Sequence, residues 1–143
     1  MAYNTIIVKG DGEQYEALAN AAITPGQLVE LMSTGKIRKV TAASAEQEKL
    51  VAIEDYLQGK TIAQDYAADA ICLHRAFKSG DEVLLILADG QNVAIGDMLE
   101  SAGGGEVKKY SAGVKLFVAR EAVDASDSAT TAVADRRIIG RVI

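Results

Sequence analysis

The sequence predicts a mainly β fold: a single small β-barrel or β-tulip-like domain with an internally duplicated β unit and an extended N-terminal arm. Short apolar runs separated by glycine-containing turns about every eight to twelve residues are typical of all-β barrels and sandwiches. Two fifteen-residue stretches, beginning at Gly26 and Gly96, resemble each other. The chain has 143 residues, 49% of them apolar, which is enough for one domain with a core and too few for two ordinary domains.

The chain begins with a short strand pattern and an ambiguous segment. Residues 4–10, NTIIVKG, are rich in β-branched side chains and lead into a Gly-Asp-Gly turn. The segment that follows contains alanine and glutamate, which favour a helix, but its alternation from Tyr15 to Ala19 is also compatible with a strand. We assign residues 1–24 to the N-terminal arm and residues 25–143 to the β domain.

The two similar stretches predict a duplicated unit. The first, GQLVELMSTGKIRKV, aligns without a gap with the second, GDMLESAGGGEVKKY. Each copy has a glycine turn, a strand, a second turn and a second strand, and an apolar strand follows it, LVAIED in one copy and FVAREA in the other. One open β unit cannot bury its apolar face alone, so we expect the two units to pack together. Chance similarity between two glycine-bounded hairpins is the alternative. The identical pairs are Gly26/Gly96, Glu30/Glu100, Gly35/Gly105 and Lys39/Lys109.

The segment Glu46–Ile53 is open between helix and strand. Ser44 could serve as an N-cap, and the polar residues after it suit the first turn of a helix. The apolar run Leu50–Ile53 is equally typical of a buried strand. We favour the strand because the related segment KLFVARE, residues 115–121, has a strongly β-like pattern.

The run DEVLLILA, residues 81–88, is apolar on both faces of a predicted strand. Either this strand is central in its sheet, or one of its faces is covered by another subunit, and we favour the second. The Asp-Gly turn that follows it, in ADGQNV, predicts a hairpin.

Composition and charge argue against several partners. The net charge is −5 and the basic residues are scattered, which argues against nucleic acid because phosphate binding needs a basic face. We interpret the one short basic cluster, Arg136-Arg137, as part of a solvated strand or an ion pair. No run of about 18 apolar residues predicts a membrane helix, and the N-terminus lacks the pattern of a signal peptide. We expect the protein to stay in the cytoplasm in which it is made, or in a particle assembled there.

We predict no catalytic, cofactor-binding or metal-binding residues. The single cysteine, Cys72, and the single histidine, His74, share one face of a predicted strand, but such positions lie about 6–7 Å apart, too far for a direct hydrogen bond. The acidic segments at Asp11 and Asp124 lack the ligand spacing of a calcium loop. The glycine-rich turn at Gly103–Gly105 is not followed by the Lys-Ser/Thr pair or by the helix that a phosphate-binding loop requires. The chain is therefore expected not to be an enzyme, and no small-molecule substrate is expected.

A series of turns and strands then follows in a distinctive order: Gly59-Lys60 before Tyr66, Gly80-Asp81, LADGQNV, GDMLES, the turn Gly103–Gly105 and the ending VAREAVD…RRIIGRVI. This order, over roughly Thr24–Ile143, resembles that of head decoration (cement) proteins of tailed bacteriophages. The resemblance implies a small β domain, often of the β-tulip kind. It also implies a homotrimer that binds the outside of the expanded capsid and clamps neighbouring capsomers.

The resemblance further implies the partners and the location: the major capsid protein, other copies of this chain, and the capsid exterior of a virion made in the host cytoplasm. We expect the arm to add as a strand to an exposed sheet edge. The alternatives are a tail or other virion-associated β module, and a stand-alone β-barrel binding domain. The predicted capsid contacts are Tyr3, Ile6, Ile7 and Val8 of the arm and Gly103, Gly104 and Gly105 of the glycine-rich turn.

Overall fold

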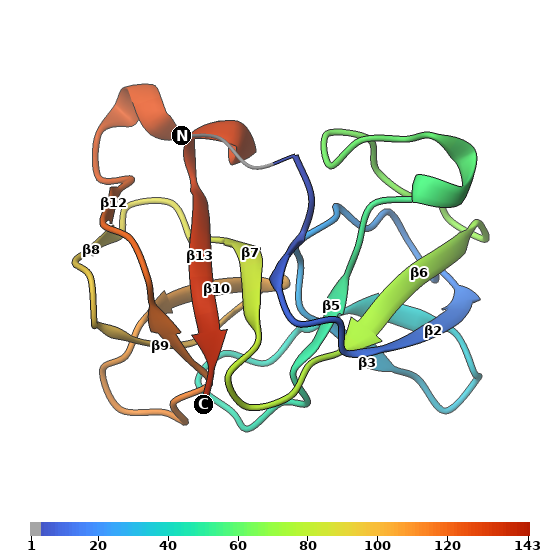
Figure 1. Cartoon of the computed structure of the whole chain (residues 1–143), viewed down its shortest axis with the longest axis horizontal. Helices are drawn as coiled ribbons and strands as arrows, with labels where there is room; N and C mark the ends of the chain where they lie inside the picture. Colours follow the sequence, from blue (N-terminus) through green and yellow to red (C-terminus); the bar gives the residue numbers. More distant parts are fainter. Residues whose placement is uncertain (1–3) are drawn as a thin grey trace.

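The computed structural model describes residues 4–143, which form short β strands and three single-turn 3-10 helices (Figure 1). The mainly β prediction is confirmed. The strands are β1 (Ile7–Lys9), β2 (Glu13–Leu18), β3 (Val29–Leu31), β4 (Ile37–Lys39), β5 (Leu50–Ala52), β6 (Ile71–Ala76), β7 (Glu82–Ile86), β8 (Asn92–Val93), β9 (Met98–Gly103), β10 (Glu106–Lys109), β11 (Phe117–Ala119), β12 (Val123–Asp124) and β13 (Arg137–Val142). The 3-10 helices are η1 (Tyr56–Gln58), η2 (Ser128–Thr130) and η3 (Val133–Asp135).

The chain folds as two β repeats with the same strand order. In the first repeat, residues 13–77, the order is β2-β6-β5, and a bridge between Leu28 and Val51 joins β5 to the hairpin β3–β4. In the second repeat, residues 81–143, the order is β7-β13-β11-β9-β10. The first repeat lies on the right of Figure 1 and the second on the left. The duplication predicted from the hairpins is confirmed and extends over most of the chain.

The two hairpins have the same register over three residue pairs, and a bulge between Glu106 and Val107 shifts only the tip of the second hairpin. Glu30 lies opposite Arg38 in the first hairpin, and Glu100 lies opposite Lys108 in the second. Each pair forms an ion pair, with N–O distances of 2.8 Å and 3.5 Å. These cross-strand pairs, which occur in both hairpins, show which residues of the two repeats are structurally equivalent.

The turn before each hairpin is also repeated. Gly26 and Gly96 both have positive φ angles, of 97° and 90°, which a residue with a Cβ rarely adopts. The next residue in each copy, Gln27 or Asp97, accepts a hydrogen bond from the backbone N–H three positions earlier, at 2.9 Å in both. The glycine and the polar side chain thus recur because one turn geometry needs both.

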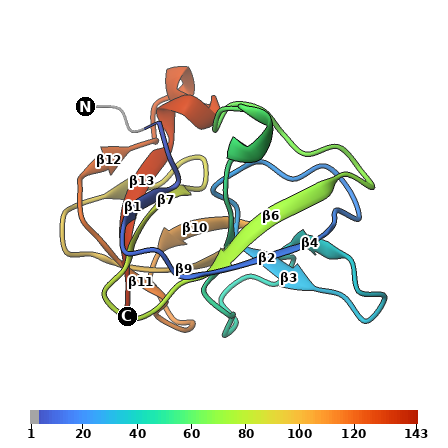
Figure 2. The same cartoon turned by 45° about the vertical axis from the view of Figure 1, so that its right-hand side comes forward.

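The predicted arm is not separate from the core in its described part, residues 4–24. Strand β1 pairs antiparallel with β7, and β2 pairs with β6 over its whole length. Ile6 and Ala19 are fully buried, and Ile23 is 1% exposed. The segment that could have been a helix is therefore strand β2, and the strand that was expected to add to an exposed sheet edge pairs with β7 of its own chain. Figure 2 shows β1 beside β7.

The run DEVLLILA, which was expected either to be a central strand or to have one face covered by another subunit, contains the central strand β7. It lies between β1 and β13 in the six-stranded sheet. All residues from Val83 to Leu87 are buried within this chain. The preference for a face covered by another subunit was wrong, because the side chains on both faces of β7 are already buried within this chain.

The sheets do not close into a barrel, so that part of the fold prediction was wrong. The end of β2 meets β4 through a single parallel bridge between Ala19 and Ile37, and β7 meets β10 through the equivalent bridge between Leu87 and Val107. A barrel needs a continuous, staggered ladder around its circumference. These strands have only two to six residues, and the turns between them interrupt the ladder.

The open segment Glu46–Ile53 contains strand β5 and no helix. Leu50 to Ile53 are all buried, and β5 pairs with β6 as β11 pairs with β13. A run of four buried apolar residues needs cover on both faces, which a surface helix would lack. The preference for a strand here is confirmed.

Candidate functional site

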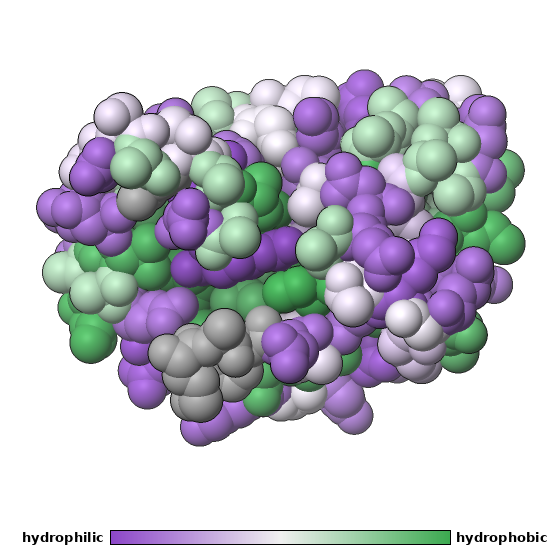
Figure 3. All heavy atoms as spheres, turned by 90° about the horizontal axis from the view of Figure 1, so that it is seen from above, coloured by the Kyte–Doolittle hydropathy of each residue, from purple (hydrophilic) through white to green (hydrophobic). Residues whose placement is uncertain are grey.

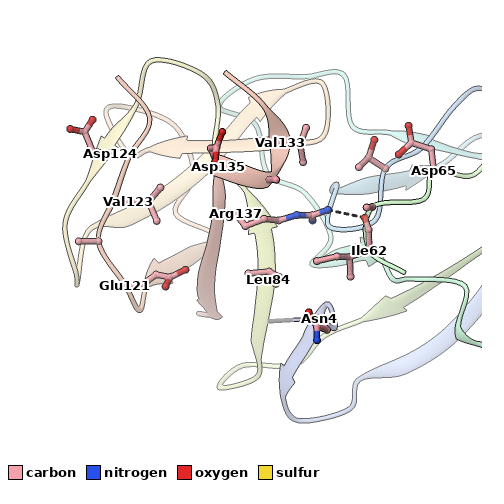
Figure 4. A pocket seen from close by; sticks show the side chains of 14 residues that line it. Asn4, Ile62, Asp65, Leu84, Glu121, Val123, Asp124, Val133, Asp135 and Arg137 are labelled. Atoms are coloured by element: carbon pink, nitrogen blue, oxygen red, sulfur yellow. Dashed lines mark hydrogen bonds between the residues drawn. The ribbon is translucent and has the colours of Figure 1, made fainter. Parts of the chain in front are cut away.

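A cleft of about 850 Å³ opens where the two repeats meet, beside the sheet of the second repeat (Figure 4). Its walls come from the first-repeat loop after η1 and from η3, β12 and the start of β13. Seen from above, the surface is hollowed here, and hydrophilic and hydrophobic side chains lie side by side along the bottom of the hollow (Figure 3). The lining residues are Asn4, Thr24, Ile62, Ala63, Asp65, Leu84, Glu121, Ala122, Val123, Asp124, Val133, Ala134, Asp135 and Arg137.

Arg137 crosses the cleft and links the two repeats. Its guanidinium donates to the backbone carbonyl of Pro25 and, at 3.0 Å, to that of Ile62. Burial lowers the pKa of Arg137 to about 10, while the nearby carboxylates of Asp65 and Glu54 act to raise it. Because both terminal nitrogens donate to carbonyls of the first repeat, Arg137 holds the two walls of the cleft together.

The remaining charge of the cleft is acidic. Glu121 accepts a hydrogen bond from the backbone N–H of Ile139 at 3.1 Å, which fixes its carboxylate in the cleft. Hydrogen bonds from Ser126 lower the pKa of Asp124. The four carboxylates of Asp65, Glu121, Asp124 and Asp135 thus line the cleft together with apolar side chains, among them Leu84. This arrangement suits an extended segment with apolar side chains and flanking basic groups, and it disfavours phosphate.

The pair Cys72 and His74 does not have the geometry or the protonation of a nucleophile and its base. Both side chains are buried, and His74 Nδ1 lies 3.1 Å from the backbone carbonyl of Cys72. Burial raises the pKa of the Cys72 thiol to about 12, so the thiol is protonated at neutral pH. The imidazole of His74 instead stacks on Tyr15, with ring centroids 6.2 Å apart.

Within residues 4–143, no group of three or more His, Cys, Asp or Glu side chains is placed to hold a metal ion. In the same part of the chain, no helix has the length and apolarity needed to cross a membrane. The basic cluster predicted as a solvated strand or an ion pair is divided: Arg136 forms an ion pair with Glu106 at 3.0 Å, and Arg137 fastens the cleft.

The predicted contact residues lie in two places. In the arm, Ile6 is fully buried and donates its backbone N–H to Glu54 at 3.2 Å, whereas Ile7 and Val8 are partly buried. Tyr3 lies outside the described residues. None of the described predicted contact residues lines the cleft; of the segment assigned to the arm, Asn4 and Thr24 line it.

The glycine-rich turn lies at the junction of the two repeats. Only Gly104 of the three glycines is exposed, and a Cβ on Gly105 would lie 2.8 Å from the Cβ of Gln27. The turn is thus a packing element within the chain. The cleft itself was not predicted, because residues such as Asp65 and Arg137 are distant in the sequence and carry no motif.

Comparison with known proteins gives a structural match alone. No known family matches the sequence, and no curated protein is significantly similar to it. The structure is similar to that of the head fiber gp8.5 N base in bacteriophage phi29, with a TM-score of 0.56 and 11% sequence identity. The match covers 91% of this chain and 92% of that chain, so the two chains share a fold over nearly their whole lengths.

Proposed function

We propose that this chain is a structural protein of a tailed-phage particle, which binds the outside of the expanded capsid as a homotrimer and stabilises contacts between capsomers. The fold shared with a phage head fiber base is the observation that carries the proposal. The resemblance of its turns and strands to head decoration proteins supports the same role. Its partners are the major capsid protein and other copies of itself.

The cleft is the proposed contact with the capsid protein. Its apolar lining residues and the carboxylates of Asp65, Asp124 and Asp135 complement an extended, basic segment of a partner chain. Such charge complementarity raises the association rate and selects the partner. In a trimer, three such contacts act together, so a weak single contact is sufficient for stable attachment.

The test is sedimentation of purified protein with expanded heads that lack it, compared with unexpanded precursor heads. The proposal predicts binding to the expanded heads only. Asp135→Lys reverses a charge on the cleft rim, and Glu46→Lys makes the same reversal on an exposed side chain outside the cleft. We expect Asp135→Lys to weaken binding at least about tenfold, or about 1.4 kcal/mol, and Glu46→Lys to leave it unchanged. Equal binding of both variants would contradict the role of the cleft.

A second candidate is the base of a fiber attached to the head, favoured by what the neighbouring structure is: the base of a phage head fiber. The two functions differ in copy number. A decoration protein saturates every equivalent position on the shell, whereas a fiber base occupies the positions of the fibers. Counting the copies bound per head at saturation separates them.

A further inference from the structure

The two repeats meet head to tail, through different surfaces of the same fold. The second repeat contributes the tip of its hairpin β9–β10. The first repeat contributes the strands that receive this tip: Leu28 donates its N–H to the carbonyl of Gly105 at 2.8 Å, and Gly105 donates to the carbonyl of Val40 at 2.9 Å. A bridge between Ala43 and Ala102 extends this contact. If the repeats met through a two-fold axis, both would contribute the same positions, and they do not.

Each surface used in this junction therefore has an unused copy on the other repeat. The copy of the inserted tip is the β3–β4 hairpin of the first repeat, with its neighbours on β2 and β6; we call this the hairpin end. The copy of the receiving surface is formed by residues 94–98 and 110–114 of the second repeat; we call this the cradle end. In Figure 1 the turn between β3 and β4 lies at the right edge of the molecule, and the segment after β8 lies at the left edge.

Exposure differs between the used and the unused copies. Pro25 and Ser101 are buried at the internal junction, but their equivalents Ile95 and Leu31 are 68% and 66% exposed. Ile71, the equivalent of the cleft residue Arg137, is 54% exposed. Water thus contacts large apolar side chains at positions where the internal junction buries smaller or polar ones.

The exposed apolar side chains gather on these two ends. Of the nine large apolar residues that are exposed among the described ones, five belong to the ends. Such a concentration marks an interaction surface better than single exposed residues do. The five are Leu18, Leu31 and Ile71 on the hairpin end and Ile95 and Val114 on the cradle end.

We propose that copies of this chain associate head to tail, with the hairpin end of one copy in the cradle end of the next, repeating the internal junction between the repeats. We assign a second copy of the chain as the occupant of each end, because the equivalent surfaces already bind each other at the junction between the two repeats. A head-to-tail contact is heterologous, and it generates a closed ring when its rotation closes. The inference deepens the homotrimer of the proposed function by naming its two surfaces: three chains would place six repeats around one ring.

The test uses one substitution at each end and a matched control. Leu31→Asp places a charge on the hairpin end, Ile95→Asp on the cradle end, and Leu57→Asp on a side chain that is 67% exposed and belongs to neither end. Mass in solution is measured by analytical ultracentrifugation. The proposal predicts a trimer for the wild-type chain and for Leu57→Asp, and a monomer for each of the other two variants.

Mixing the two end variants is the decisive step. Leu31→Asp retains an intact cradle end, and Ile95→Asp retains an intact hairpin end, so an equimolar mixture should form a dimer of one copy each and nothing larger. A dimer also shows that both variants are folded. A wild-type chain that is monomeric at its highest soluble concentration, or a mixture that stays monomeric, would overturn the proposal.

Head binding measured on the same proteins keeps this inference distinct from the proposed function. A wild-type trimer that does not bind expanded heads would remove the capsid role and leave the junction in place. Heads saturated equally by the wild-type chain and by a monomeric variant would support the capsid role and show that the trimer is not needed for it.

Discussion

Replacing Ile6 by alanine tests whether the N-terminal strand belongs to the core. Ile6 has no exposed surface, and the substitution removes three buried carbon atoms. At about 0.8 kcal/mol for each buried methylene, the transfer of these atoms accounts for about 2.4 kcal/mol. The cavity left behind adds to this, so we expect a loss of about 3–4 kcal/mol, within the usual range for such substitutions. In a chain of this size, that lowers the Tm by about 10 °C.

The assay is urea unfolding followed by circular dichroism, with Ile7→Ala as the matched control. Ile7 is the next residue in the chain, begins strand β1 and is only partly buried, so its substitution should cost less than about 1.5 kcal/mol. A free energy of unfolding for Ile6→Ala within about 0.5 kcal/mol of the wild-type value would contradict this. It would mean that residues 4–10 do not contribute to the core and that the pairing of β1 with β7 is not a stable part of the fold.

Because the repeats are equivalent, one repeat provides controls for the other. Glu100 is fully buried, and its carboxylate accepts hydrogen bonds from Ser111 and from the backbone N–H of Gly113. We therefore expect Glu100→Ala to lower the free energy of unfolding, measured in urea, by at least about 2 kcal/mol. Glu30→Ala, at the equivalent and partly exposed position, should lower it by less than about 1 kcal/mol. Gly105→Ala should destabilise more than Gly35→Ala by the same assay, because both have positive φ but only the Cβ at Gly105 meets a neighbour, at 2.8 Å. Burial lowers the pKa of His74 in the folded chain below 6.5. The unfolded chain therefore binds a proton more readily than the folded chain, and the free energy of unfolding decreases as the pH drops below about 6.5. The wild-type chain should lose more stability than His74→Gln between about pH 7.5 and about pH 5.5, and equal losses would contradict this.

The sequence predicted those parts of the fold that depend on local patterns. Glycine turns around Gly26 and Gly96 identified the duplicated hairpins, because only a few residues tolerate the backbone conformation that these turns need. The similarity of Leu50–Ile53 to the segment at Phe117 resolved the choice between helix and strand. In both cases the signal lies within a few residues of the structure that it predicts.

The parts that failed depend on contacts between distant residues. Ile6 and Ala19 were assigned to an arm because their short segments offer no sign of what covers them, and the cover comes from β7 and β6. The run at Val83 was assigned to an interface for the same reason. The cleft could not be predicted either, since Asp65 and Arg137 meet only because the two repeats pack together.

The most direct test of the central claim is electron cryo-microscopy of expanded heads incubated with a saturating amount of the protein. We expect added density on the outer surface, with three copies around each three-fold position and the hairpin β3–β4 of each copy in contact with the next copy. A shell without added density, or density that is confined to the tail or to a few fiber positions, would contradict it.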